Sequence, residues 1–207
     1  VYLVAAGKAA WQMAHAARAC LQDNFCGGVV VTKYGHVKGE IANVACFEGG
    51  HPVPDENSLR GTDAALALTE DLTESDTVVF LLSGGGSALF EKPLLPLAEL
   101  QDVTNQLLAA GADIVEINTI RKRLSAVKGG RFARHCAPAQ VFAVVLSDIL
   151  GDPLDMIASG PAYPDSSSCA QALDIAKRYG LRLSEWAWAL LAQETPKTLE
   201  NVETQIT

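Results

Sequence analysis

Residues 78–90 read VVFLLSGGGSALF, an apolar run that ends at three consecutive glycines with a serine on each side. The run is short and does not alternate between apolar and polar residues, which is typical of a strand in a parallel sheet covered on both faces. Glycines just beyond the carboxyl end of such a strand let backbone N–H groups approach an anion closely. We therefore predict a central strand at residues 77–82 and a phosphate-binding loop made of Ser83, Gly84, Gly85, Gly86 and Ser87. The alternative is a tight turn whose glycines only relieve crowding between the strand and the next helix.

Apolar strand patterns alternate with helical patterns along the rest of the chain. Strands are predicted at residues 1–5, 29–33, 44–47, 77–82 and 141–146. Helices are predicted near residues 9–21, 59–72, 97–110, 113–124, 168–179 and 183–193. This alternation predicts a doubly wound, mostly parallel sheet sandwiched between helices, a Rossmann-like α/β/α fold with right-handed crossovers.

Composition excludes several classes of function. A chain of 207 residues with a net charge of -8 suffices for one α/β domain but is unlike a general nucleic-acid or membrane binder. It has no apolar stretch long enough to span a bilayer and no signal peptide. Its five cysteines form no C-x-x-C pair, which favours reduced thiols in a cytoplasmic protein. The absence of an initiator Met and a start inside a strand indicate a piece of a longer protein.

The segment AAGKAAW places Lys8 at the turn between the first strand and the first helix. Helix N-termini attract anions, and a lysine there adds a point charge suited to phosphate. The segment is neither a Walker A loop nor a G-x-G-x-x-G dinucleotide fingerprint. The alternative for Lys8 is a solvated side chain in the first helical turn.

Residues 117–147 contain no acidic side chain but six basic ones, although the protein as a whole is acidic. These are Arg121, Lys122, Arg123, Lys128, Arg131 and Arg134. Such a segment predicts a positive site for an acidic ligand. The alternative is a basic helix face that pairs with acids elsewhere in the chain.

Two loops offer further candidates. In LSDILGD, Asp148 directly follows a buried strand and is placed to hold Mg²⁺, with Asp152 as a second ligand, a supporting partner or a turn residue. In GGHPVPD, His51 lies between Gly50 and Pro52 and is held by a rigid loop, where substrate contact and simple packing are both open. The histidines suggest no metal set, and H-E-x-x-H is absent.

Seven segments, in order, closely resemble the amino-terminal domain of the type II glycerate 2-kinases, some of whose relatives are labelled hydroxypyruvate reductase. They are GKAAWQMA, VVVTKYGH, GGHPVPDENS, LLSGGGSALF, EINTIRKRLSAVKGGRFA, LSDILGDPLDMIASGP and YPDSSS. The resemblance implies phosphorylation of D-glycerate at its 2-hydroxyl with ATP and Mg²⁺. It also implies a second, carboxy-terminal domain that closes the cleft. That domain and the family's leading helix are missing, so residues 1–207 are expected to be a single-domain fragment of a two-domain protein.

Three features carry over from the family's motifs. Lys8 matches the lysine regarded as essential, residues 83–87 match the glycine loop, and Arg121 matches the arginine of INTIRK. Two positions depart from the pattern: Arg123 stands where many members have histidine, and Pro153 where many have aspartate.

We hypothesise that the loop amides hold phosphate and that two cations neutralise charge on the transferred group. The cations are Lys8 and Arg121, and Asp148 and Asp152 are the expected Mg²⁺ ligands. Glycerate would be surrounded by His51, Asp55 and Lys128. Because no nucleic-acid or membrane partner is expected, the predicted partners are D-glycerate and the carboxy-terminal domain, and a homodimer is left open.

Three other functions compete with this one. An NAD(P)H-dependent hydroxypyruvate reductase is disfavoured because no glycine fingerprint follows the first strand and no acidic residue closes the second. An acyl hydrolase using Ser83 or Ser87 lacks G-x-S-x-G and a late histidine. A non-enzymatic binding module is the third alternative.

Overall fold

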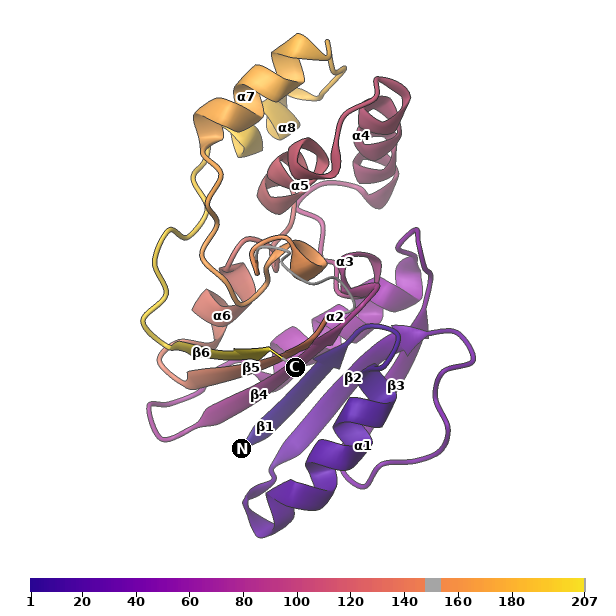
Figure 1. Ribbon diagram of the computed structural model, residues 1–207, viewed down its shortest axis with the longest axis vertical. Helices are drawn as coiled ribbons and strands as arrows, with labels where there is room; N and C mark the ends of the chain where they lie inside the picture. Colours follow the sequence, from indigo (N-terminus) through magenta and orange to yellow (C-terminus); the bar gives the residue numbers. More distant parts are fainter. Residues whose placement is uncertain (148–153, 207) are drawn as a thin grey trace.

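The computed structural model describes residues 1–147 and 154–206, and its described strands form a six-stranded sheet (Figure 1). The order across the sheet is β3-β2-β1-β4-β5-β6, and every pairing is parallel, so the predicted parallel sheet is confirmed. The strands are β1 (Tyr2–Ala6), β2 (Gly27–Lys33), β3 (Val44–Gly49), β4 (Thr77–Ser83), β5 (Gln140–Leu146) and β6 (Val202–Ile206). The apolar runs of β1, β2 and β4 reflect burial on both faces at the centre of the sheet.

The described helices begin and end largely where the sequence predicts. They are α1 (Ala10–Leu21), α2 (Glu56–Leu68), α3 (Gly86–Leu89), α4 (Leu97–Ala109), α5 (Ile114–Arg123), α6 (Arg131–Cys136), α7 (Cys169–Arg178) and α8 (Glu185–Leu191), with 3₁₀ turns η1 (Gln22–Asn24) and η2 (Ile157–Ser159). Asp55, Asp113 and Ser168 cap α2, α5 and α7 through capping boxes. Gly111 follows α4 with a left-handed φ of 78°, as expected of a residue that ends a helix.

The two halves of the sheet are wound in opposite directions from β1. The chain proceeds from β1 outward to β2 and β3, then returns to form β4 on the other side of β1. Ala6 of β1 is in register with Leu82 of β4, so the two strands end side by side. In open α/β sheets this switch point is where a crevice for ligands forms.

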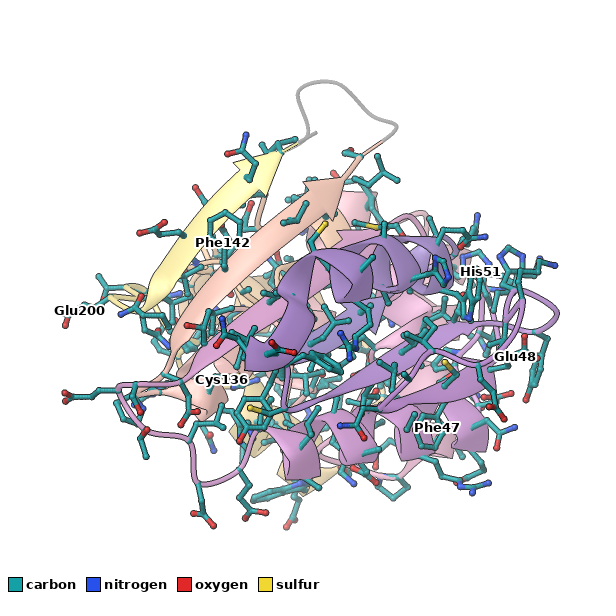
Figure 2. The ribbon with its side chains drawn as sticks, turned by 90° about the horizontal axis from the view of Figure 1, so that it is seen from below. Phe47, Glu48, His51, Cys136, Phe142 and Glu200 are labelled. Atoms are coloured by element: carbon teal, nitrogen blue, oxygen red, sulfur yellow. The ribbon has the colours of Figure 1, made fainter. Side chains whose placement is uncertain are left out.

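Helices cover the two faces of the sheet unequally (Figure 1). One face packs on α2, α3 and α6, and its core includes Phe80, Phe90 and Phe132. The other face packs on α1, with Ala10 and Ala14 against the strands. Beyond the cover of α1, Phe142 of β5 keeps 39% of its surface exposed (Figure 2).

The remaining helices, α4, α5, α7 and α8, stand away from the sheet and pack around a core of their own (Figure 1). Leu107, Ile120, Leu124 and Leu191 are fully buried in this core. Helix α5 also contacts α3, which follows β4, because Arg121 Nη2 donates a hydrogen bond to the Ser87 carbonyl at 3.0 Å. The site at the switch point therefore receives residues from both parts of the fold.

None of the helices within residues 1–147 and 154–206 is long and apolar enough to cross a bilayer.

Candidate functional site

The turn after β1 lies directly against the loop after β4. Lys8 N–H donates to the Gly84 carbonyl at 2.9 Å, and Ala9 N–H donates to the Ser83 hydroxyl at 3.0 Å. Gly7 permits this approach, because a Cβ there would lie 2.5 Å from the Ser83 carbonyl oxygen. Lys8 and the glycine loop are thus neighbours, and the Ser83 side chain is buried in holding them together.

The three glycines of the loop differ in their backbone conformation and in their surroundings. Gly85 has a φ of +89°, and Gly86 is so close to Ala158 that an added Cβ would lie 2.8 Å from the Ala158 Cβ. Gly84 has no left-handed φ, and nothing within 4 Å of an added Cβ. Relief of crowding therefore accounts for Gly86 but leaves Gly84 unexplained.

Four consecutive backbone amides of the loop are unpaired among the described residues and could bind a ligand. Within the described part of the chain, the N–H groups of Gly84, Gly85, Gly86 and Ser87 have no hydrogen-bond acceptor. Unpaired backbone N–H groups are costly unless water or a ligand accepts from them. A run of such amides forms a concave site suited to an anion.

Lys8 and His51 flank the middle of the loop. A Cβ at Gly85 would lie 3.0 Å from His51 Nε2 and 3.3 Å from Lys8 Cγ. The Lys8 side chain is exposed, and its ammonium has no partner among the residues that the structure describes. Burial, Lys8 and Lys33 lower the pKa of His51, which favours its neutral form.

Arg121 borders the other side of the loop from its position on α5. Its Nη2 donates to the Ser87 carbonyl and lies 3.2 Å from a carboxylate oxygen of the buried Glu91. Its Nε is buried without a partner among the described atoms. Arg121 is therefore partly neutralised by Glu91 and fixed in direction toward the loop.

A series of hydrogen-bonded polar side chains connects the loop to η2 and α5. The Ser87 and Ser159 hydroxyls lie 3.2 Å apart, and the Ser159 hydroxyl donates to Asn118 Oδ1 at 3.0 Å. Ala158 and Ser159 both adopt left-handed φ values, 52° and 61°, which are rare for residues with a side chain. Asn118 lies one helical turn before Arg121, so the i, i+3 spacing was the signal that sequence reasoning missed.

A cavity of about 340 Å³ lies beside the glycine loop, at the carboxyl ends of β4 and β5. Its walls include His51, residues 83–88, Asn118, Arg121 and η2. Among the described residues that line it, none is acidic and Arg121 is the one cation, so the cavity offers the loop amides and one guanidinium to a ligand. This arrangement suits an anion such as phosphate.

Two predicted substrate ligands are engaged by the protein itself. Asp55 caps α2, accepting from Ser58 N–H at 2.9 Å and from the Tyr34 hydroxyl at 2.7 Å. Burial acts to raise the pKa of Asp55, but hydrogen bonds from Ser58, Tyr34 and Gly50 outweigh it and lower the pKa. The Asp55 carboxylate therefore holds the loop that carries His51, and direct contact with substrate stays a prediction.

Lys128 is fully buried behind the glycine loop. Its ammonium donates to the carbonyls of Ser87 and Phe90 at 2.8 and 2.9 Å and lies 3.4 Å from Glu91. Burial lowers the pKa of Lys128 to about 8, against the opposing effect of Glu91. In this position Lys128 anchors the backbone of α3, and its predicted contact with glycerate is untested.

Most of the basic segment is used inside the protein. Lys122 lies 3.0 Å from both Asp155 and Asp165, and Arg123 lies 3.5 Å from Asp165. Arg131 donates to the carbonyls of residues 122, 123 and 125 at the end of α5. For Lys122 and Arg123 the structure confirms pairing with distant acids, and of the six basic residues Arg121 is the one recorded at the cavity.

The predicted metal ligands Asp148 and Asp152 lie outside the described residues, as does Pro153. The described ranges contain no group of three or more His, Cys, Asp or Glu side chains arranged to hold a metal ion.

Comparisons with known proteins show the family and the relatives of this chain. Residues 1–192 match the family model described as "Domain of unknown function (DUF4147)". The chain is 57% identical over 205 residues to D-glycerate 2-kinase of Thermotoga maritima, covering 98% of this chain and 49% of that protein. It is 44% identical over 202 residues to a putative hydroxypyruvate reductase of Agrobacterium vitis, covering 96% of this chain and 46% of that protein. A crystal structure of the T. maritima glycerate kinase superposes with a TM-score of 0.96 at 56% identity, over 99% of this chain and 50% of that one. The chain thus spans about half the length of these relatives.

Proposed function

Since this chain belongs to the family described as a domain of unknown function (DUF4147), we propose that it is the phosphate-binding half of a glycerate 2-kinase. The reaction is transfer of the terminal phosphoryl group of ATP to the 2-hydroxyl of D-glycerate. One observation carries the proposal: four unpaired backbone amides lie beside an unpaired lysine, among the described residues, at the switch point of the sheet.

Phosphoryl transfer depends mainly on positioning and on neutralising charge. In the proposed mechanism the amides of residues 84–87 hold the phosphates of the donor. Lys8, an exposed side chain beside Gly85 of the loop, neutralises charge that develops on the transferred group. Arg121, held by Glu91 and Ser87, fixes the position of that group from the opposite side.

The acceptor is proposed to lie against His51. The lowered pKa keeps the ring neutral at neutral pH, and a neutral imidazole has one nitrogen that can accept a hydrogen bond from a hydroxyl. Asp55 and Lys128 act from behind this surface, by holding the His51 loop and α3 in place.

The resemblance also implies Mg²⁺, which would supply charge neutralisation on the donor phosphates. The described lining of the cavity has no carboxylate to hold it. Asp148 and Asp152 remain the proposed ligands, and we assign no step to the metal. We further propose that a second domain of the same protein closes the cavity, because the chain covers only 49% of its T. maritima relative.

The test is a coupled kinase assay on the complete enzyme with ATP and D-glycerate, with the position of phosphate in the product read by ³¹P NMR. Formation of 2-phosphoglycerate is expected. NADH oxidation with hydroxypyruvate, without phosphorylation of glycerate, would instead establish the reductase. That reaction is disfavoured because β2 ends at Lys33 rather than at an acidic residue that could bind ribose.

A further inference from the structure

A second cavity, of about 300 Å³, lies between the loop after β3 and helix α4. We refer to it as the α4 groove. Pro52 and Pro54 form one wall, and Leu100 and Leu108 of α4 contribute to the other. Gln101 Nε2 donates to the Pro54 carbonyl at 3.2 Å, which ties the two walls together.

The α4 groove adjoins the glycine-loop cavity. Pro52 and Arg121 line both. A ligand whose phosphates lie on residues 84–87 would therefore pass Arg121 and extend between the proline wall and α4. The only charged side chain lining the groove among the described residues is Arg121, at the end shared with the phosphate loop.

The chemistry of the groove suits a flat, uncharged group. Val53 and Leu108, both in its lining, leave 56% and 59% of their surfaces exposed, although isolated apolar side chains of this kind are common at surfaces. Asn105 stands in the lining with a carboxamide that has no hydrogen-bond partner in the described part of the chain. Apolar walls with a few polar groups are the usual form of small-molecule sites.

We propose that the α4 groove binds the base of the nucleotide donor, with Asn105 as a hydrogen-bonding group at the base edge. The inference rests on the proposed kinase function and adds where the base lies. D-glycerate is a poor occupant, because it is small, charged and hydroxylated and gains little from apolar walls.

The experiment compares a nucleotide with a polyphosphate that has no base. Thr104→Phe, in the complete enzyme, places a ring in the groove, and Ala109→Phe adds the same ring on an exposed position of α4 outside the lining. Inhibition by ADP and by inorganic tripolyphosphate is measured, with KM for ATP and for D-glycerate. For Thr104→Phe, we expect ADP inhibition to weaken and KM for ATP to rise by at least about tenfold. Tripolyphosphate inhibition and KM for glycerate should be unchanged, and Ala109→Phe should resemble wild type.

Unchanged ADP inhibition in an active Thr104→Phe enzyme overturns the groove assignment alone. The assignment is also overturned if inhibition by ADP and inhibition by tripolyphosphate weaken equally, or if only KM for glycerate rises. A wild-type enzyme that does not phosphorylate glycerate removes the kinase proposal itself. If Thr104→Phe fails to fold, Leu108→Ser tests the groove assignment instead, because Leu108 is exposed. Its loss should weaken inhibition by ADP and leave inhibition by tripolyphosphate unchanged. A lower Tm for Leu108→Ser with unaltered ADP affinity would mean that another part of the protein covers the groove.

Discussion

Gly86 and Ala158 are packed so closely that a single added methyl group at Gly86 would lie 2.8 Å from the Ala158 Cβ. Ala158 cannot retreat easily, because it lies in a left-handed turn whose neighbours Ser159 and Gly160 accept hydrogen bonds from Gly129 and Gly130. We expect Gly86→Ala to lower the free energy of unfolding by about 1–3 kcal/mol, as overpacking does in other cores. Chemical denaturation of the complete enzyme measures this, and a variant as stable as wild type would contradict the packing explanation.

Gly84 provides the matched comparison. An added Cβ there meets nothing within 4 Å, and its φ is not left-handed, so Gly84→Ala should keep the stability of wild type. If the open side of Gly84 faces the donor phosphates, the methyl group should raise KM for ATP by about tenfold or more. The measurement is steady-state kinetics alongside the denaturation curves. Normal kinetics would place the phosphates elsewhere.

Lys8 is predicted to act on the reaction and not on the fold. Its side chain is exposed, and its ammonium has no partner among the described residues, so Lys8→Ala should leave Tm nearly unchanged. Loss of a charge aimed at the transferred group should reduce kcat by about 100-fold or more. Lys38→Ala, which removes an exposed lysine of the loop after β2, is the control and should retain full turnover. Near-normal turnover of Lys8→Ala would remove Lys8 from the mechanism.

The pKa of His51 should report the Lys8 charge directly. Burial, Lys8 and Lys33 all lower this pKa from its ordinary value of 6.5. The folded protein then binds fewer protons at His51 than the unfolded chain does. The contribution of His51 to the free energy of unfolding should therefore fall as pH drops below about 6.5. Histidine NMR titration of the complete enzyme should show a pKa below 6.5 that rises in Lys8→Gln. The same pKa in both proteins would show that Lys8 does not act on the ring.

Much of the sheet was predictable because its central strands are buried on both faces. Apolar runs such as residues 77–82 have no other stable place in a chain of this size. Strand β6 was not predicted, because Val202–Ile206 is polar and half-exposed at the sheet edge, without the apolar run that marked the others. Helix α3, with four residues, is too short for helical periodicity to appear.

The candidate site was predicted most directly where residues follow central strands. Lys8 and the glycine loop meet because parallel strands end at one edge of the sheet. The basic segment was harder to interpret, because the partners of Lys122 lie 33 and 43 residues further along the chain, at Asp155 and Asp165. The spacing of residues in the sequence does not reveal such long-range ion pairs. Cations that stabilise the fold could therefore not be distinguished from cations that bind a ligand.

Asp165 is the centre of that buried ion cluster, and its loss should cost more stability than any surface charge. It accepts from Lys122 at 3.0 Å, from the Thr195 hydroxyl at 2.6 Å and from Ser167, and it is 2% exposed. Asp165→Ala leaves a buried cation incompletely paired, so the free energy of unfolding at pH 7 should fall by about 3–5 kcal/mol. Asp174→Ala, at an exposed ion pair with Arg178, is the control and should change nothing measurable.

The pH dependence separates the charge of Asp165 from its packing. Burial acts to raise the pKa of Asp165, but hydrogen bonds from Thr195 and Ser167 and the charge of Lys122 outweigh it, so the pKa lies below its ordinary 3.8. The stabilising contribution is therefore complete above that value and is lost as pH falls through the lowered pKa of the folded state. Wild-type and Asp165→Ala free energies of unfolding should thus converge on acidification, as followed by denaturation at a series of pH values. A difference that stays constant down to the lowest pH at which the wild type folds would mean that the lost atoms, and not the carboxylate charge, account for the destabilisation.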